Sequence, residues 1–386
     1  MKRKLRMGMI GGGSDAFIGA IHRAAALMDN RIELVCGCFS IDPEISRSSG
    51  QACFVPDDRI YASWQEMIAG EYALPESIRM DFVSIVTPNM VHFEPAMAAL
   101  DAGFDVVIEK PMTWSLDEAV KLKAQVEKSG RTLALTHTYT GYPAVKEARR
   151  RIAQGMLGKV RKIYVEYPQG WLSSRVEDDP ASNAGWRLDP KRSGKAGTMG
   201  DIGTHALNLA EYVSGLRCTE ICADIRACVP GRMLDDDGAA LLRFGEEVGG
   251  VLIASQIAAG EENALKIRIY GEKGGMEWLQ EEPNTLIMKW CDRPAERLRV
   301  GNGYMSDIAK ANSRTPGGHP EGYIEAFANI YRNFALTVSA RREGIAPQSE
   351  WLDFPTVDDG LRGMQFIETI VASGYEQEKK WIKWVE

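Results

Sequence analysis

The first 140 residues alternate short apolar runs with segments of helical periodicity, and this alternation restricts the fold more than any other feature. The strand-like runs lie at 5–10, 32–38, 82–87, 105–109 and 132–137. Helical segments between successive strands are typical of a parallel sheet covered by helices. The helix expected at 115–130 is the clearest, because Ser115 and Glu118 form a capping box and Gly130 follows its end. We therefore expect an α/β fold whose residues 1–140 form a doubly wound parallel-sheet domain.

Beyond residue 140 the pattern changes to longer strands, many of them alternating apolar and polar side chains. These strands are expected at 159–167, 219–229, 238–244, 249–258 and 264–271. Consecutive strands with few helices between them indicate a largely antiparallel, open sheet. Helical periodicity returns at 322–338 and 358–374. We expect residues 141–386 to form a second, α+β domain.

A glycine-rich turn follows the first strand, in the stretch MGMIGGGSDAFIG. Gly11, Gly13 and Ala16 fit the dinucleotide fingerprint with alanine in its last place, and Gly19 takes that place if the turn is longer. Glycines there let the backbone approach a pyrophosphate at a helix N-terminus. The alternative is a glycine turn with no ligand. The glycine stretch lies on the first strand-to-helix turn of an alternating domain, and this position favours dinucleotide binding over the alternative.

In such domains, residues at the end of the second strand usually bind the adenosine ribose of the cofactor. Ser40 stands at the expected acidic position, Asp42 follows two residues later, and Arg47 is near enough to contact a 2′-phosphate. An acidic residue favours the free ribose of NAD, whereas a basic one favours NADP. We expect NAD, with NADP as the alternative.

Asp201 and His205 are four residues apart where a glycine-rich run turns into a helical segment. Side chains at this spacing lie on one face of a helix and can act on one small molecule. Spacing alone leaves metal ligation, acid–base chemistry and capping of the helix by Asp201 open. The other histidines are scattered without metal-binding spacing, so we expect no dedicated metal site.

Composition excludes several classes of partner. The formal net charge is −7 and the isoelectric point is near 5.5, so nucleic acid and anionic lipid are not expected as partners. The apolar stretch near the N-terminus is too short and too glycine-rich for a signal peptide or a membrane span. We expect a cytoplasmic protein.

Several motifs in the right order resemble the Gfo/Idh/MocA oxidoreductases, named for glucose–fructose oxidoreductase, inositol dehydrogenase and a rhizopine-catabolism protein. They are the glycine turn, TPNMVH at 87–92, EKP at 109–111 and the segment 186–205 that ends in D-x-x-x-H. The resemblance implies that Lys110, Asp201 and His205 form the catalytic group. His205 is then the general base, Asp201 orients a hydroxyl or assists the proton relay, and Lys110 stabilises the reacting oxygen.

The resemblance also implies binding residues. The loop from Thr87 to His92 matches the one that lines the nicotinamide. The expected cofactor residues are Gly11, Gly13, Ala16, Phe17, Ile18, Ser40, Asp42, Arg47, Thr87, Pro88, Asn89, His92, Glu109 and Lys110. His137 and Tyr139 match substrate positions, although Thr140 replaces the arginine that usually follows them.

Further substrate contacts are expected from Gln169, Trp171, Trp186 and Arg187, because aromatic faces beside hydrogen-bonding groups suit sugar rings. Core packing of the tryptophans is the alternative. His319 lies with Glu321 and Tyr323 before a helix, as a second polar wall or as helix caps. We expect a dehydrogenase of a pyranose, pyranoside, anhydrosugar or inositol that forms a homodimer or homotetramer. The alternatives are a glycoside-cleaving enzyme that oxidises its substrate transiently, and a regulatory protein that kept the fold.

Overall fold

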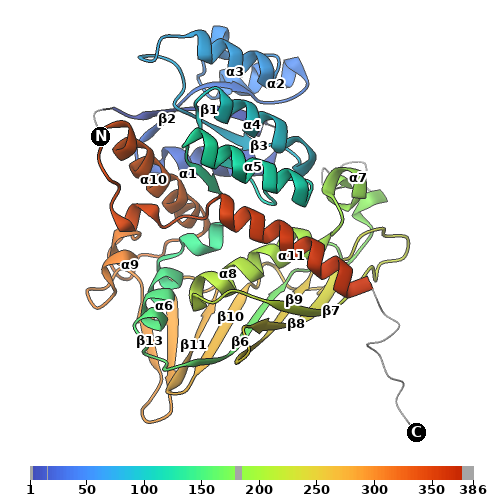
Figure 1. The fold of residues 1–386 in the computed structure, drawn as a ribbon, viewed down its shortest axis with the longest axis vertical. Coiled ribbons are helices and arrows are strands. Elements are labelled where there is room, and N and C mark those ends of the chain that lie inside the picture. Colours follow the sequence, from blue (N-terminus) through green and yellow to red (C-terminus); the bar gives the residue numbers. More distant parts are fainter. Residues whose placement is uncertain (1–2, 15, 179–184, 376–386) are drawn as a thin grey trace. The chain divides into compact units, whose positions relative to one another are not determined.

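The structure, a computed structural model, describes residues 3–14, 16–178 and 185–375 (Figure 1). The chain forms two compact units. Unit 1 comprises Met1–Gly141 and Gly322–Arg362, and unit 2 comprises Tyr142–Glu321 and Gly363–Glu386. Residues 322–362, which we expected in the second domain, therefore lie in the first unit. Among the described residues, no helix has the length and apolar character needed to cross a lipid bilayer.

Unit 1 contains the parallel sheet that the alternating pattern predicts, which confirms this part of the expected fold. Its strands are β1 (Leu5–Gly11), β2 (Ile32–Cys38), β3 (Phe82–Val86), β4 (Asp105–Ile108) and β5 (Leu133–Leu135). They pair in parallel in the order β2-β1-β3-β4-β5. The winding reverses between β1 and β3, and the carboxyl ends of strands at such a point form the ligand-binding edge of these sheets.

Helices connect the strands of unit 1. They are α1 (Phe17–Met28), α2 (Pro43–Ala52), α3 (Trp64–Ala73), α4 (Phe93–Asp101) and α5 (Leu116–Ser129). The capping box at the start of α5 is present, and Gly130 ends the helix with a φ of 63°.

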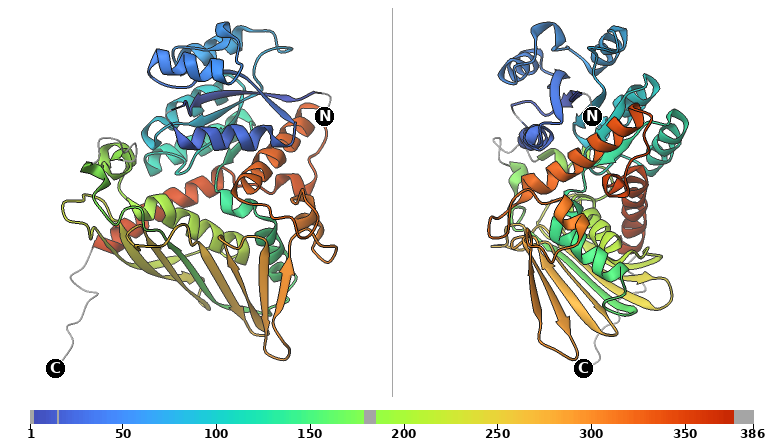
Figure 2. Two further views of the ribbon diagram at one scale, coloured as in Figure 1. Left: turned by 180° about the vertical axis from the view of Figure 1, so that it is seen from behind. Right: turned by 90° about the vertical axis from the view of Figure 1, so that its left-hand side faces the viewer.

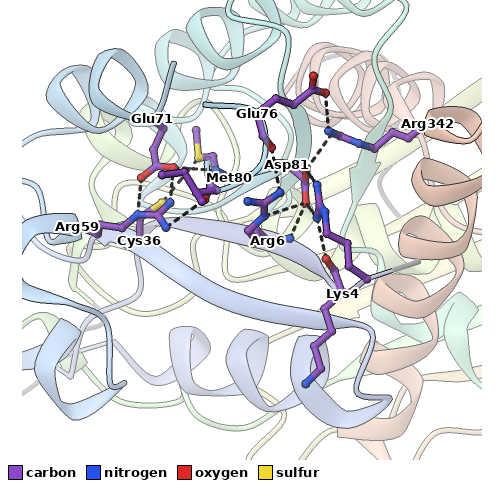
Figure 3. Close-up of polar contacts among 11 residues, drawn as sticks. Lys4, Arg6, Cys36, Arg59, Glu71, Glu76, Met80, Asp81 and Arg342 are labelled. Atoms are coloured by element: carbon purple, nitrogen blue, oxygen red, sulfur yellow. Dashed lines mark hydrogen bonds and ion pairs between the residues drawn. The ribbon is translucent and has the colours of Figure 1, made fainter. Parts of the chain in front are cut away.

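A helix from late in the sequence, α10 (Tyr323–Arg342), completes unit 1 and lies beside α1 (Figure 1). Phe327, Tyr331 and Phe334 of α10 are buried in one core with residues of β1, β3, β4 and α1. At its end, the Arg342 guanidinium lies 3.0 Å from a carboxylate oxygen of Asp81 and 3.1 Å from Glu76 (Figure 3). The burial of these aromatic side chains stabilises α10 within unit 1.

Unit 2 is built on an eight-stranded sheet of order β13-β12-β11-β10-β6-β9-β8-β7. Its strands are β6 (Val160–Pro168), β7 (Glu220–Arg226), β8 (Asp237–Phe244), β9 (Val248–Ser255), β10 (Lys266–Gly271), β11 (Gly274–Leu279), β12 (Thr285–Trp290) and β13 (Glu296–Arg299). Every neighbouring pair is antiparallel except β6 and β9, as the expected mostly antiparallel sheet requires. The sequence pattern missed β11, β12 and β13, which are at most six residues long.

Helices lie over one face of this sheet (Figure 2). The helices of unit 2 are α6 (Pro143–Ala153), α7 (Pro190–Ser193), α8 (Thr204–Ser214), α9 (Asp307–Ala311) and the part of α11 (Val357–Tyr375) that follows Arg362. On β8, Gly238, Ala240 and Leu242 are buried, whereas Ala239 and Leu241 on the other face are exposed. The alternation is that of a sheet with one face in the core.

Candidate active site

The turn between β1 and α1 depends on glycine at three positions. Gly11 and Gly12 have φ angles of 78° and 71°, in the left-handed region that favours glycine. A Cβ on Gly19 would lie 2.2 Å from the carbonyl oxygen of Gly12, so α1 packs directly on the turn. Gly19 rather than Ala16 therefore occupies the close-packed last position of the fingerprint.

The N-terminus of α1 fits an anionic group. Ala16 is the residue before the helix, no side chain of the described residues caps it, and the first turn contains no acidic residue. Unsatisfied N–H groups and the helix dipole make such an end a binding site for phosphate. Phe17 is exposed here, while Ile18 packs against the core. The Gly13 N–H donates to the carbonyl of Phe39 at 3.0 Å and ties the turn to the end of β2.

Ser40 and Asp42 form a turn after β2. One carboxylate oxygen of Asp42 accepts the N–H groups of Glu44 (2.8 Å) and Ile45 (3.1 Å), so Asp42 caps α2. The Ser40 hydroxyl oxygen accepts the Asp42 N–H at 3.2 Å. Arg47 is exposed on α2. Asp42 thus caps α2, as an aspartate directly before a Pro-Glu pair is typical of a helix start.

Thr87, directly after β3, carries a buried hydroxyl that has no hydrogen-bond partner within residues 3–14, 16–178 and 185–375. Its methyl group would be 3.0 Å from a Cβ on Gly11. Buried polar atoms normally have partners, so an orphaned one beside the glycine turn fits a ligand atom. Pro88 and the buried Asn89 begin the short turn that follows. The glycine turn, the open end of α1 and Thr87 together fit a dinucleotide.

His92 supports the loop that follows β3, and its expected contact with the cofactor stays a prediction. Its ring is buried, with Nδ1 2.9 Å from the carbonyl oxygen of Pro111 and Nε2 2.8 Å from that of Thr87. Burial lowers the pKa of His92, although both carbonyls act in the opposite direction. The imidazole therefore joins the segments after β3 and β4 and supports the loop from within.

Glu109 lies at the end of β4 in a buried polar network that orients the next residue. Its Oε1 is 2.9 Å from His22 Nε2 and accepts the Thr136 hydroxyl, while its Oε2 accepts the Lys110 N–H at 3.2 Å. Burial raises the pKa of Glu109, but the bond to His22, the charges of His22 and Lys110, and the bond to Thr136 bring it down to about 2. Nδ1 of His22 is 2.6 Å from the Tyr331 hydroxyl. Sequence reasoning missed His22, because a lone histidine on a helix has no distinguishing pattern.

Lys110 is half-buried and follows this network, with a cis peptide bond to Pro111. Burial and the charge of Lys110 lower the pKa of His137 to about 3, against the opposite effect of Glu109. A neutral imidazole therefore lies near the Lys110 ammonium at the carboxyl edge of the parallel sheet. Tyr139 is buried, and its ring centre lies 6.3 Å from that of Tyr323 on α10.

In unit 2, Asp201 and His205 lie where a π-helical turn, η6 (Met199–Gly203), continues into α8. The Asp201 N–H donates to the carbonyl of Gly197 at 2.9 Å, so the chain is already helical before α8. The residue before α8 is Gly203, and the interpretation of Asp201 as the cap of this helix is therefore wrong. His205 is 8% exposed, and its ring centre lies 6.5 Å from that of Tyr167. π-Helical turns are frequent at functional sites.

The start of this helical segment is held by Asp235, which the sequence pattern did not single out. Its carboxylate accepts the N–H groups of Gly197 (2.7 Å) and Met199 (2.8 Å). Burial raises the pKa of Asp235 to about 6, although these two hydrogen bonds lower it. The position of Asp201 therefore depends on a buried carboxyl outside the motif.

The Asp201 side chain belongs to a hydrogen-bonded group at the ends of β6 and β9, which sequence reasoning identified only in part. Gln256 Nε2 donates to Asp201 Oδ2 at 2.9 Å and to Gln169 Oε1 at 3.1 Å. Trp171 Nε1 also donates to Gln169 Oε1, at 3.1 Å, and Gln169 Nε2 donates to Asn263 Oδ1 at 2.7 Å. Trp171 is 37% exposed, so its ring is accessible and not packed in the core. The structure brings Asp201, Gln169 and Trp171 into one group.

Trp186 and Arg187 lie together in a short 3₁₀ turn, with the guanidinium carbon 4.7 Å from the centre of the indole. Both are half-buried. No bond among the described residues links this pair to the Asp201 group. Their contact with a substrate stays a prediction.

The segment 314–321 forms a closed loop. His319 is exposed, and its Nδ1 lies 3.2 Å from the Pro316 carbonyl oxygen. Glu321 is buried and accepts the N–H group of Thr315 at 2.7 Å, so it closes this loop and does not cap α10. The cap of α10 is Gly322, whose N–H donates to Glu325 at 2.8 Å.

Across the described ranges, no group of three or more His, Cys, Asp or Glu side chains is placed to hold a metal ion.

Two family models match the chain in order. Residues 5–137 match the oxidoreductase family with an NAD-binding Rossmann fold, and residues 145–277 match the GFO/IDH/MocA C-terminal domain. An uncharacterized oxidoreductase of Bacillus subtilis (strain 168), YfiI, is 32% identical over 386 residues, which are 99% of this chain and 98% of the relative.

Solved structures agree with these matches over nearly the whole chain. An inositol dehydrogenase homolog from Azotobacter vinelandii complexed with NAD⁺ is 33% identical, with a TM-score of 0.92 over 97% of this chain and 96% of the other. An inositol dehydrogenase homolog from Azotobacter vinelandii complexed with NADH and myo-inositol is 32% identical. Its TM-score is 0.89, over 97% of this chain and 96% of the other. The chain belongs to the GFO/IDH/MocA family and is an NAD-binding oxidoreductase.

Proposed function

We propose that the chain is an NAD-dependent dehydrogenase that oxidises a ring hydroxyl of an inositol or of a related pyranose, pyranoside or anhydrosugar. The observation that carries this proposal is the turn that joins a carboxylate, Asp201, to an almost buried imidazole, His205, at the start of α8. Proton removal from an alcohol needs a base that titrates near neutral pH, and imidazole has that property. The myo-inositol complex of the Azotobacter homolog supports inositols as the first substrates to test.

The cofactor would be held by the first unit. The open N-terminus of α1 would bind the pyrophosphate, and the Gly11–Gly12 turn leaves room for it. Ser40 and Asp42 would contact the adenosine ribose, and the Thr87 hydroxyl would donate to or accept from the nicotinamide half. NAD, when bound, supplies the hydride acceptor.

Three side chains would act on the substrate. A ring nitrogen of His205 accepts the hydroxyl proton. Asp201, whose Oδ2 accepts a hydrogen bond from Gln256, orients that hydroxyl. The Lys110 ammonium stabilises negative charge that develops on the oxygen as the proton leaves. The ionised Glu109 fixes the backbone of Lys110, so that the ammonium is presented from a rigid strand end.

The surroundings of Asp201 support this substrate class. Cyclic polyols and pyranoses present C–H patches beside hydroxyl groups. The accessible ring of Trp171 suits the C–H patches, and the amides of Gln169 and Gln256 lie beside it. We place Trp186 and Arg187 in the same binding surface by their position in the family motif.

The experiment is a substrate panel with each cofactor. The purified protein is incubated with NAD or NADP and with inositol isomers, methyl glucosides, free hexoses and levoglucosan, and reduced cofactor is followed by its absorbance. Net formation of NADH with a cyclic polyol or sugar is expected, with NAD preferred. Cleavage of a methyl glucoside without accumulation of NADH would contradict the proposal and support the transient-oxidation alternative. Faster turnover with NADP would refute the roles of Ser40 and Asp42.

We also propose that the protein is a homodimer or homotetramer. The sheet face that carries Leu241 and Ile253 has exposed apolar side chains on the neighbouring strands β8 and β9. Apolar groups that cluster on a sheet face are typical of an interface. Light scattering coupled to size-exclusion chromatography measures the mass, and a monomer at micromolar concentration would refute the proposal.

A further inference from the structure

Gln256 holds the Asp201 carboxylate, although the two residues are 55 positions apart in the sequence. It is the first residue after β9, and Gln169 is the first residue after β6. These two strands are the parallel pair of the sheet, so their carboxyl ends lie side by side. The sheet therefore brings two amides to the same edge, next to η6.

The Gln256 amide is buried, with 2% of the residue exposed, and each of its hydrogen-bonding groups is used. Nε2 donates to Asp201 Oδ2 at 2.9 Å and to Gln169 Oε1 at 3.1 Å. Oε1 accepts the hydroxyl of the buried Thr198 at 2.8 Å. A carboxylate only accepts, so the NH₂ group must face Asp201 and the oxygen must face Thr198. The amide thus has one orientation.

Other ionisable groups surround this pair. They are His205 on α8, Tyr167 on β6, and Asp235, Asp236 and Arg232 before β8. The Gln256 N–H donates to the Asp236 carbonyl oxygen at 2.9 Å, and the Asp236 carboxylate is paired with Arg232 at 3.0 Å. Asp235 accepts the N–H groups on both sides of Thr198. The Asp236 carboxylate is therefore paired with Arg232, and the Asp235 carboxylate accepts backbone N–H groups. The group that faces Asp201 is the neutral amide of Gln256.

We propose that Gln256 is a positioning residue for the reaction: its amide fixes Oδ2 of Asp201 through a hydrogen bond that favours the ionised carboxylate, and so sets the orientation in which Asp201 meets the substrate. This inference rests on the proposed function, in which Asp201 orients the reacting hydroxyl. Hydrogen bonds from a neutral donor to a carboxylate are strong and directional, and small misplacements of a catalytic group lower rates by large factors.

Gln256→Glu tests this role through the shape of the pH profile. At low pH the new carboxyl group is protonated and donates to Asp201, as the amide does. As pH rises the pair loses this proton, and two adjacent carboxylates repel each other. We expect kcat near the wild-type value at the acidic end and a fall of about 10-fold or more on the alkaline side, where the wild-type profile rises or stays level.

The matched control is Gln125→Glu. Gln125 of α5 is also buried, and its Nε2 donates to the Asp101 carboxylate, so the same substitution is made beside an aspartate outside the site. Its pH profile should keep the wild-type shape. A Gln256→Glu profile parallel to that of the wild type would overturn the inference.

A second measurement needs neither cofactor nor turnover. Aspartate labelled with ¹³C at the side-chain carboxyl reports the titration of Asp201 by NMR, with Asp201→Asn to assign the signal. Gln256→Met is nearly isosteric and removes the donor, so the Asp201 carboxyl should take up its proton at higher pH than in the wild type. An unchanged midpoint would refute the positioning role. If the wild type oxidises no substrate of the panel, the proposed function fails, whereas this titration still decides whether Gln256 controls Asp201.

Discussion

Replacing Gly19 by alanine should move α1 away from the glycine turn. The new Cβ would lie 2.2 Å from the carbonyl oxygen, 2.4 Å from the Cα and 2.6 Å from the carbonyl carbon of Gly12. All three atoms are backbone, so no side chain can rotate to make room. The N-terminus of the helix must therefore shift by about 1 Å to reach ordinary van der Waals contact at 3.4 Å.

The free-energy change has two opposing parts. Overpacking of this kind costs about 1–3 kcal/mol. Alanine is better than glycine inside a helix by about 1 kcal/mol, which offsets part of that cost. We expect a net loss of about 0–2 kcal/mol in the free energy of unfolding. The effect on NAD should be larger, because a displacement of about 1 Å in a positioned group changes its interaction by on the order of 10- to 100-fold.

The assays are urea denaturation for the free energy of unfolding and titration calorimetry for the dissociation constant of NAD. Gly303→Ala is the control, since no atom lies within 4 Å of a Cβ at that position. It should leave both values unchanged. A Gly19→Ala protein with wild-type stability and an NAD affinity within three-fold of the wild type would show that α1 does not pack on the turn as described.

Three further predictions concern the proposed chemistry and the network beneath it. Lys110→Met should lower kcat by on the order of 100-fold while the Kd of NAD, measured by calorimetry, stays within a few-fold, because the ammonium acts on the reacting oxygen; unchanged turnover would exclude that role. In His205→Gln the rise of the oxidation rate with pH, expected near the usual imidazole range of about pH 6.5, should disappear and kcat should fall by roughly 100-fold; an unaltered pH profile would leave Lys110 as the candidate for proton transfer. Glu109 has a pKa of about 2 in the folded protein against 4.5 ordinarily, so its contribution to stability is present above about pH 4.5 and is lost as pH falls toward 2. Glu109→Gln should therefore be less stable than the wild type at pH 7, by on the order of 3 kcal/mol at most, and urea denaturation at several pH values should show a flatter acid dependence; equal stabilities at pH 7 would contradict the assignment.

Short sequence patterns predicted those parts of the molecule whose conformation is determined by residues close together in the sequence. Each of these parts combines a short sequence pattern with a position in the alternation of strands and helices. They are the glycine turn, the strand ends at Thr87 and Glu109, and the helix at Asp201. Position in the sequence also explains why capping was an alternative for Asp201, because a carboxylate just before a helical pattern is typical of a helix cap. The π-helical turn that removes this role depends on Asp235, which lies 34 residues further along the chain.

The groups that support these residues had no local signal. Gln256 follows a strand as a single amide, and only the pairing of β6 with β9 shows that it faces Asp201. His22 lies on α1 between Ile21 and Arg23, and its partners Glu109 and Tyr331 come from distant segments. Hydrogen-bond partners separated by tens or hundreds of residues are set by tertiary packing, which a single sequence does not display.

The return of α10 to the first unit affects how the protein can be made. During synthesis on the ribosome, β1 to β5 emerge long before Phe327, Tyr331 and Phe334, which complete their core. Until then the apolar side chains beside α1 have no cover, and His22 and Ser84 lack the Tyr331 hydroxyl that they contact in the finished protein. The nascent first unit therefore cannot close before the 180 residues Tyr142–Glu321 of the second unit have been translated. A fragment that stops at Gly141 should be recovered as an aggregate or in complex with chaperones.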